Sequence, residues 1–78
     1  MEEKIKQYIL NEFLPGEDPT LLTSTTPLIS GGILDSLATL RMVAFLEEEF
    51  SVEIEAHETG LEYFNTISDM MKLINSKL

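Results

Sequence analysis

The chain has 78 residues, which is near the lower size limit for a domain that supports its own hydrophobic core. A hydrophobic fraction of 44% is sufficient for a core, so we expect one folded domain over residues 1–78 rather than a disordered chain. Fourteen acidic residues against five basic ones give a net charge of −9. This charge argues against nucleic acid and anionic membranes as partners and favours proteins with basic patches.

The sequence contains no cysteine, so neither a disulfide nor a zinc–thiolate site can form, and any thiol must be brought in from outside. No apolar run approaches the roughly 18 residues that span a membrane, and the N-terminus lacks a signal-peptide pattern. We therefore expect a cytoplasmic monomer without membrane insertion.

The first half of the chain is predicted to contain one helix and a long loop. Residues 1–14 have a single apolar face, formed by Ile5, Tyr8, Ile9 and Phe13, and Pro15-Gly16 ends this helix. Residues 17–34 contain prolines and a Thr/Ser run that exclude a continuous helix, yet they also contain six aliphatic residues. We expect this loop to lie across the core, with Leu28 and Ile29 as buried anchors.

The longest predicted helix covers residues 36–50. One face has the spacing of a core stripe: Thr39, Met42, Val43, Leu46 and Phe50. The other side mixes apolar and charged residues, which indicates a docking surface: Leu37, Leu40, Arg41, Ala44, Phe45 and Glu48. The alternative is that the long loop covers some of these side chains. Residues 47–49 are three consecutive glutamates, which usually form a solvated face.

Two further helices are predicted near the C-terminus. Residues 59–62 match a capping box, which predicts a short helix over residues 60–64 with Leu61 and Phe64 facing inward. Asn65 or Thr66 is expected to cap a last helix, whose apolar face consists of Ile67, Met70, Met71, Ile74 and Leu78. The fold class is therefore all-α, an irregular four-helix bundle with three longer helices, one short helix and a long first loop. The predicted core is Ile5, Ile9, Phe13, Leu28, Ile29, Met42, Val43, Leu46, Phe50, Leu61, Phe64, Ile67, Met71 and Ile74.

Ser36 has an unusual setting at the start of the longest helix. Gly31 and Gly32 allow a sharp turn and close backbone approach just before it, and Asp35 is a good N-cap. Ser36 then occupies the first helical position, where a phosphate on its hydroxyl would be favoured by about 0.3–1 kcal/mol from the helix dipole. The alternative is that Asp35 and Ser36 only cap the helix.

Catalytic motifs are absent from the sequence. The single histidine, His57, lies in a connector with no predicted nucleophile beside it. The chain has neither a His-Glu-x-x-His motif nor a phosphate-binding Gly-x-x-x-x-Gly-Lys loop. We therefore expect no catalytic residues, no metal site and no enzymatic activity.

The tripeptide Asp35-Ser36-Leu37 at a helix start resembles the attachment motif of phosphopantetheine-dependent acyl carrier proteins. The flanking sequences, Thr26–Ile29, Gly32–Leu34 and Phe45–Ile54, are also similar to that family at the right spacing. The resemblance covers essentially the whole chain. It implies that a phosphopantetheinyl transferase esterifies Ser36 with a 4′-phosphopantetheine arm taken from coenzyme A. The thiol of this arm would carry an acyl or aminoacyl group as a thioester to ligase or synthase enzymes with basic docking patches.

The resemblance also implies a docking face. The positions that match the family's usual docking residues are Asp35, Leu37, Leu40, Arg41, Ala44, Glu47 and Glu48. Fatty-acid carriers often have acids where this chain has Ala38 and Arg41. The sequence Gly-Ile-Leu-Asp-Ser-Leu is more similar to stand-alone carriers of aminoacyl, D-alanyl, polyketide or nonribosomal-peptide systems. We therefore expect a carrier of a dedicated pathway. The alternative function is an acidic helical interaction module without a prosthetic group.

Overall fold

The computed structural model describes all 78 residues and consists of helices and loops without any strand. Four α-helices occur in the order α1 (Glu2–Phe13), α2 (Ser36–Phe50), α3 (Leu61–Phe64) and α4 (Ile67–Asn75). Two short 3₁₀ turns, η1 (Pro19–Leu21) and η2 (Ala56–Glu58), lie in the connecting segments. The predicted all-α four-helix bundle is thus confirmed, and the predicted bounds of α2 agree with the structure.

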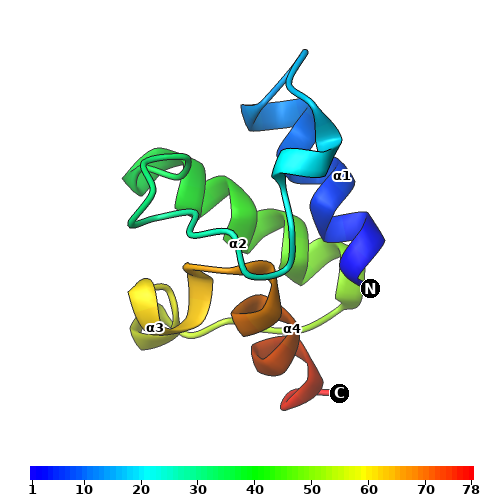
Figure 1. Cartoon of the computed structure of the whole chain (residues 1–78). Helices are drawn as coiled ribbons and strands as arrows, with labels where there is room; N and C mark the ends of the chain where they lie inside the picture. The colour runs from blue at the N-terminus through cyan, green and yellow to red at the C-terminus, as the bar shows by residue number, and fades with distance from the viewer.

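Helix α2 crosses the middle of the molecule (Figure 1). Helix α4 packs against both α1 and α3. In Figure 1, α1 lies on one side of α2, and α3 and α4 lie on the other side. The long loop between α1 and α2 passes over the interior and delivers the chain to the N-terminal end of α2. No helix is both long enough and apolar enough to cross a bilayer.

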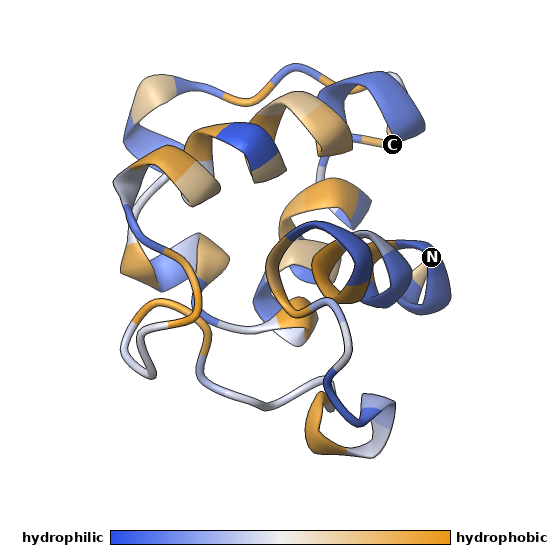
Figure 2. Ribbon diagram, turned by 90° about the horizontal axis from the view of Figure 1, so that it is seen from above, coloured by the Kyte–Doolittle hydropathy of each residue, from blue (hydrophilic) through white to orange (hydrophobic).

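The core is a cluster of fifteen buried hydrophobic residues. Hydrophobic and hydrophilic segments alternate along the helical ribbons in Figure 2, as expected for helices that bury one face. Eight of the predicted core residues are buried: Ile5, Ile9, Leu28, Met42, Leu46, Phe64, Ile67 and Ile74. Five others are half-buried and pack against this cluster: Phe13, Ile29, Val43, Phe50 and Met71.

The prediction for Leu61 is wrong, because 54% of this residue is exposed. Helix α3 is a single turn of four residues, and Phe64 provides its buried contact. The predicted capping box is also wrong. The N-cap of α3 is Gly60, and the Thr59 hydroxyl instead donates to the Ala56 carbonyl at 2.8 Å.

Seven buried core residues are absent from the predicted core, and three of them lie in segments without helical periodicity. Leu22 and Leu34 lie in the long loop, and Ile54 lies in the connector after α2. The remaining ones are on helices: Leu10, Ala38, Met70 and Leu73.

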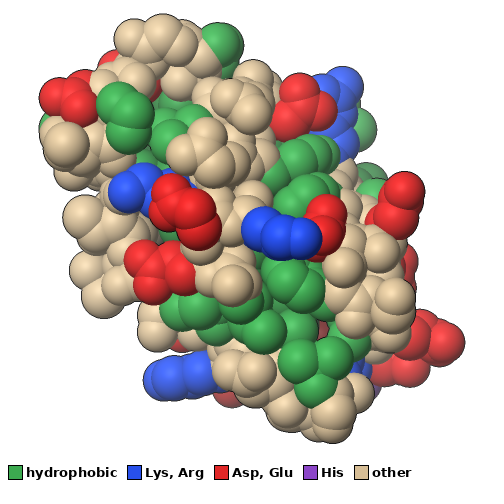
Figure 3. Space-filling view, turned by 90° about the vertical axis from the view of Figure 1, so that its right-hand side faces the viewer, with side chains coloured by type: hydrophobic (Ala, Val, Ile, Leu, Met, Phe, Trp, Pro, Cys, Tyr) green, Lys and Arg blue, Asp and Glu red, His purple; other side chains and the backbone are tan.

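Two ion pairs join distant parts of the surface. Lys4 on α1 pairs with Glu49 at the end of α2 at 2.9 Å, and Lys77 pairs with Glu58 on η2 at 2.7 Å. On the face shown in Figure 3, basic and acidic side chains lie next to each other, and hydrophobic side chains are visible between them. The acid excess therefore does not make every face of the protein uniformly negative.

Candidate functional site

The N-terminus of α2 is capped by Asp35, as the sequence predicts. Its Oδ1 accepts a hydrogen bond from the Ala38 N–H at 2.8 Å. Its main-chain carbonyl accepts from both the N–H and the hydroxyl of Thr39, each at 2.9 Å. These bonds fix the direction of the first helical turn.

Ser36 is the first residue of α2 and is exposed to solvent. Its hydroxyl makes no hydrogen bond within the chain, because the capping bonds all go to Asp35. The N–H groups of Ser36 and Leu37 have no backbone acceptor, so they are free donors beside this hydroxyl. The site therefore combines an accessible nucleophilic oxygen with a positively polarised helix end, which suits an anionic group.

Both glycines before the site have the roles expected for them. A Cβ on Gly31 would collide with the main-chain carbonyl of Pro27, so only glycine allows this close approach. Gly32 has φ +84°, a left-handed conformation that glycine adopts readily. Next, the N–H groups of Ile33 and Leu34 donate to the Leu28 carbonyl at 2.8 and 2.9 Å, which closes the turn that leads to Ser36.

Asn65 anchors the loop to the junction between α3 and α4. Its side-chain Oδ1 accepts from the N–H groups of Ile29 and Ser30 at 3.0 and 2.9 Å, and its main-chain carbonyl accepts from Leu28 at 2.6 Å. Of the two predicted caps for α4, Thr66 is the one used, and its hydroxyl accepts from the Asp69 N–H at 3.0 Å. The anchoring role of Asn65 was missed, since a single asparagine between two helices gives no periodic signal.

A surface groove of about 540 Å³ begins at Ser36 and runs between the first turns of α2 and the start of α3. Four of its nine lining residues are aliphatic, and two are threonines. The lining residues are Ile29, Leu34, Asp35, Ser36, Thr39, Leu40, Thr59, Gly60 and Leu61. This explains the exposure of Leu61, which borders the groove instead of filling the core.

The predicted docking residues are brought together on the exposed side of α2. Leu37 and Leu40 are 63% and 61% exposed, and Arg41, Ala44 and Glu48 are exposed as well. The long loop does not cover these residues. Phe45 is the exception in that group, because α1 half-buries it: its ring stacks on Tyr8 with a centroid distance of 4.0 Å.

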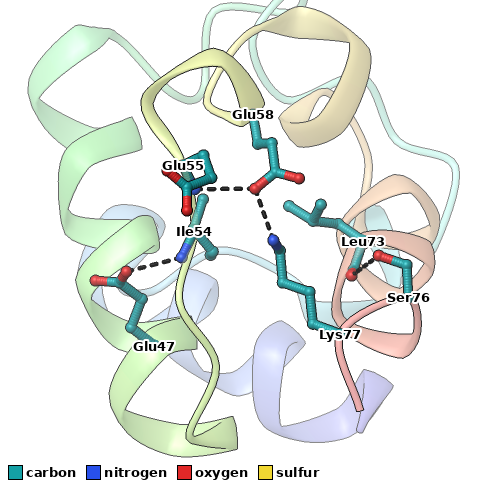
Figure 4. A network of polar contacts seen from close by, with 7 residues as sticks. All are labelled: Glu47, Ile54, Glu55, Glu58, Leu73, Ser76 and Lys77. Atoms are coloured by element: carbon teal, nitrogen blue, oxygen red, sulfur yellow. Dashed lines mark hydrogen bonds and ion pairs between the residues drawn. The ribbon is translucent and has the colours of Figure 1, made fainter.

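Glu47 has a structural contact that the sequence did not indicate. Its Oε2 accepts a hydrogen bond of 2.9 Å from the Ile54 N–H, which ties the connector to α2 (Figure 4). Glu47 is accordingly half-buried. Its predicted contribution to docking stays a prediction.

A second set of polar contacts lies beside the hydrogen bond between Ile54 and Glu47. Glu58 Oε1 accepts from the Glu55 N–H at 2.9 Å and pairs with Lys77 Nζ at 2.7 Å (Figure 4). The hydrogen bond from Lys77, with that from Glu55, lowers the pKa of Glu58 below its ordinary value. The network holds η2, which directly precedes the groove-lining residues 59–61.

Comparison with known proteins identifies the family. No family model matches the sequence. However, the chain is 36% identical over 74 residues to the probable acyl carrier protein PigG of Serratia sp. (strain ATCC 39006). The alignment covers 95% of this chain and 84% of PigG. The chain belongs to the acyl carrier protein family.

A solved structure supports the same relationship for the fold. A chain in the crystal structure of an FAD-dependent dehydrogenase is 34% identical to this carrier protein and superposes on it with a TM-score of 0.80. The match covers 90% of this carrier protein and 97% of that chain, so the two are similar in length.

Proposed function

We propose that this carrier protein bears a 4′-phosphopantetheine arm on Ser36 and presents an acyl or aminoacyl thioester to partner enzymes. The single observation that carries the proposal is the free, exposed hydroxyl of Ser36 beside two unbonded N–H groups at the start of α2. A phosphodiester at this oxygen would be stabilised by the helix N-terminus. The proposed role is that of a carrier and not of a catalyst. Because the arm derives from coenzyme A, we expect it to act in the cytoplasm.

The residues around Ser36 fit such an arm. When attached, it would supply the thiol that a chain without cysteine lacks. The groove beside Ser36 offers aliphatic contact from Leu40 and Leu61, and the hydroxyl oxygens of Thr39 and Thr59, which donate to main-chain carbonyls, can accept hydrogen bonds there. The chain's own part is to hold the attachment point in a fixed place through Asp35 and to present the face of α2 to a partner.

The test is intact mass spectrometry after incubation with coenzyme A and a broad-specificity phosphopantetheinyl transferase. We expect a gain of one phosphopantetheinyl group, mapped to Ser36 by peptide analysis. Ser36→Ala should abolish the gain while changing the free energy of unfolding by less than about 0.5 kcal/mol, since its hydroxyl has no partner.

Ser30→Ala is the matched control, because Ser30 is an exposed serine of the loop that leads to Ser36 and its side chain makes no hydrogen bond. It should be modified as well as the wild type. A folded wild-type protein that gains no mass from an active transferase would contradict the proposal. That outcome would favour an acidic helical interaction module, whose binding does not depend on modification.

We further propose that the partners belong to a dedicated pathway and include a flavin-dependent dehydrogenase. The support is the carrier-sized helical chain found in the structure of an FAD-dependent dehydrogenase. In such a step the carried group would lose a proton from its α-carbon to a base of the dehydrogenase and a hydride from its β-carbon to the FAD of that enzyme, which leaves a carbon–carbon double bond. Loss of two hydrogen atoms from the acylated protein, seen by mass spectrometry with an FAD-dependent dehydrogenase, is the expected result. An unchanged mass with a dehydrogenase active on another carrier would argue against this partner.

A further inference from the structure

Gly60 is a glycine that its own backbone does not require. It directly precedes α3 with φ −86° and ψ −174°, an extended conformation that any residue can adopt. A Cβ added here would meet no atom of a non-neighbouring residue within 4 Å. As N-cap, Gly60 makes no side-chain hydrogen bond, whereas a serine, threonine, asparagine or aspartate could cap α3. Neither the conformation nor the cap therefore accounts for a glycine at this position.

The place of Gly60 in the fold is the groove that begins at Ser36, which it lines. Leu61 lines the same side and is 54% exposed, and Leu40 on the α2 side is 61% exposed. The groove volume of about 540 Å³ lies within the range of roughly 300–1,000 Å³ that is common for small-molecule sites. The groove thus offers apolar surface from two leucines to a small group beside the attachment point.

Hydrogen bonds hold the walls of the groove on either side of Gly60. The Asn65 N–H donates to the Leu61 carbonyl at 3.2 Å, and Asn65 Oδ1 accepts from the Ile29 N–H at 3.0 Å. Leu61 and Ile29 both line the groove, so one residue joins two of its walls. The Thr59 hydroxyl donates to the Ala56 carbonyl at 2.8 Å, which fixes the residue before Gly60. A side chain at position 60 would therefore occupy open space of the groove without moving these walls.

We propose that Gly60 determines which acyl or aminoacyl groups the groove can hold, because it leaves the space beside Leu61 empty. The inference rests on the proposed carrier function. A larger residue at this position would fill that space from the side of the protein, and the carried group would stay in solvent. Gly60 is thus a specificity-determining residue for the carried group and takes no part in the chemistry of its transfer.

The test compares the wild type with Gly60→Leu after each has been loaded on Ser36 from butyryl-coenzyme A by a broad-specificity phosphopantetheinyl transferase. The reference for each protein is the same protein loaded from coenzyme A, which adds the arm without the butyryl group. The methyl NMR signals of Leu40 and Leu61 report whether the butyryl group enters the groove. We expect the butyryl-dependent shift of these signals to be at least about threefold smaller in Gly60→Leu, because the added side chain takes the space.

Ala56→Leu is the matched control. It enlarges an exposed apolar residue of the same connector, but Ala56 does not line the groove. Its butyryl-dependent shift should match that of the wild type. Melting temperatures check that each variant folds. If Gly60→Leu does not fold, Gly60→Ala provides the same comparison, with a smaller loss expected because it adds a single carbon.

Three results would overturn the role of Gly60. One is an equal shift in Gly60→Leu and the wild type. Another is the absence of any butyryl-dependent shift in the wild type, which would show that the groove does not hold the group. The third is a folded Gly60→Leu protein that the transferase fails to modify, because position 60 would then contact that enzyme. In contrast, a wild type that gains no mass on Ser36 refutes the carrier function itself.

Discussion

The Asn65 side chain is joined to Ile29 by a hydrogen bond of 3.0 Å across 36 positions of sequence. The same oxygen accepts from Ser30, and the Asn65 carbonyl accepts from Leu28. Three consecutive N–H groups of the loop thus have one residue as their acceptor. The position of the segment that leads to Ser36 therefore depends on the junction between α3 and α4.

Asn65→Ala should lower the free energy of unfolding by about 1–3 kcal/mol, because it leaves the partly buried Ile29 N–H without its acceptor. Urea denaturation measures this loss. Asn65→Asp is the control, since a carboxylate oxygen can accept the same two bonds. If the alanine variant is as stable as the wild type, the side chain does not anchor the loop.

Gly31→Ala should destabilise the protein by at least about 1 kcal/mol, because the new methyl group would meet the Pro27 carbonyl. The comparison is Gly60→Ala, where nothing lies within 4 Å of the added carbon and φ is −86°. Thermal unfolding of the two variants side by side measures the difference. Equal melting temperatures would show that the loop moves aside at no cost.

Glu47 and Glu48 are neighbours with the same charge but different surroundings. Glu47→Ala should cost about 1 kcal/mol of stability, because the Ile54 N–H loses its acceptor. Glu48→Ala should change stability by less than about 0.5 kcal/mol, since this side chain has no partner. Both variants raise the net charge by one, so the difference between their urea midpoints isolates the hydrogen bond. A larger effect for Glu48 would contradict this assignment.

The Glu58–Lys77 pair should make stability depend on pH. Because the folded-state pKa of Glu58 is lowered, its contribution is full above the ordinary glutamate pKa of about 4.3 and is lost as the pH falls through the folded value. Lys77→Met should therefore destabilise the protein at pH 7, and this difference from the wild type should shrink below about pH 4. Urea midpoints at a series of pH values measure it. Lys72→Met is the control, since Lys72 is exposed and in no ion pair; a parallel pH dependence in both variants would rule out the pair as the cause.

The regular elements were predictable because they repeat. Helix α2 was placed at its observed bounds, since Asp35 signals its start and the 3.6-residue pattern continues to Phe50. The apolar face of the first helix predicts Ile5 and Ile9 as core residues for the same reason, and both are buried. Helix α3 shows the limit of this reasoning. In a single turn of helix, periodicity cannot decide which residue faces inward, and Leu61 was placed in the core although Phe64 alone is buried there.

The parts of the site that were missed depend on contacts between distant segments. Leu22 and Leu34 are buried because the loop crosses the core, and neither belongs to a periodic pattern. The hydrogen bonds of Asn65 and Glu47 join segments that meet only in the folded protein. Nothing in the sequence distinguishes these two residues from other asparagines and glutamates. Ser36 could be predicted as the candidate site from its neighbours in the sequence. The contacts that hold the surrounding loop and connector in place could not, because they join residues far apart in the chain.

At the start of α2, the residue that caps the helix is different from the residue proposed as the attachment point. Asp35 makes every capping bond, and Ser36 contributes none, although the two residues are adjacent. A group added to Ser36 would thus leave the hydrogen bonds of the helix cap as they were before. An enzyme that must act on only the apo or only the holo protein would therefore have to detect the arm itself. Because no capping bond involves Ser36, the geometry of the cap gives that enzyme no information about whether a group is attached.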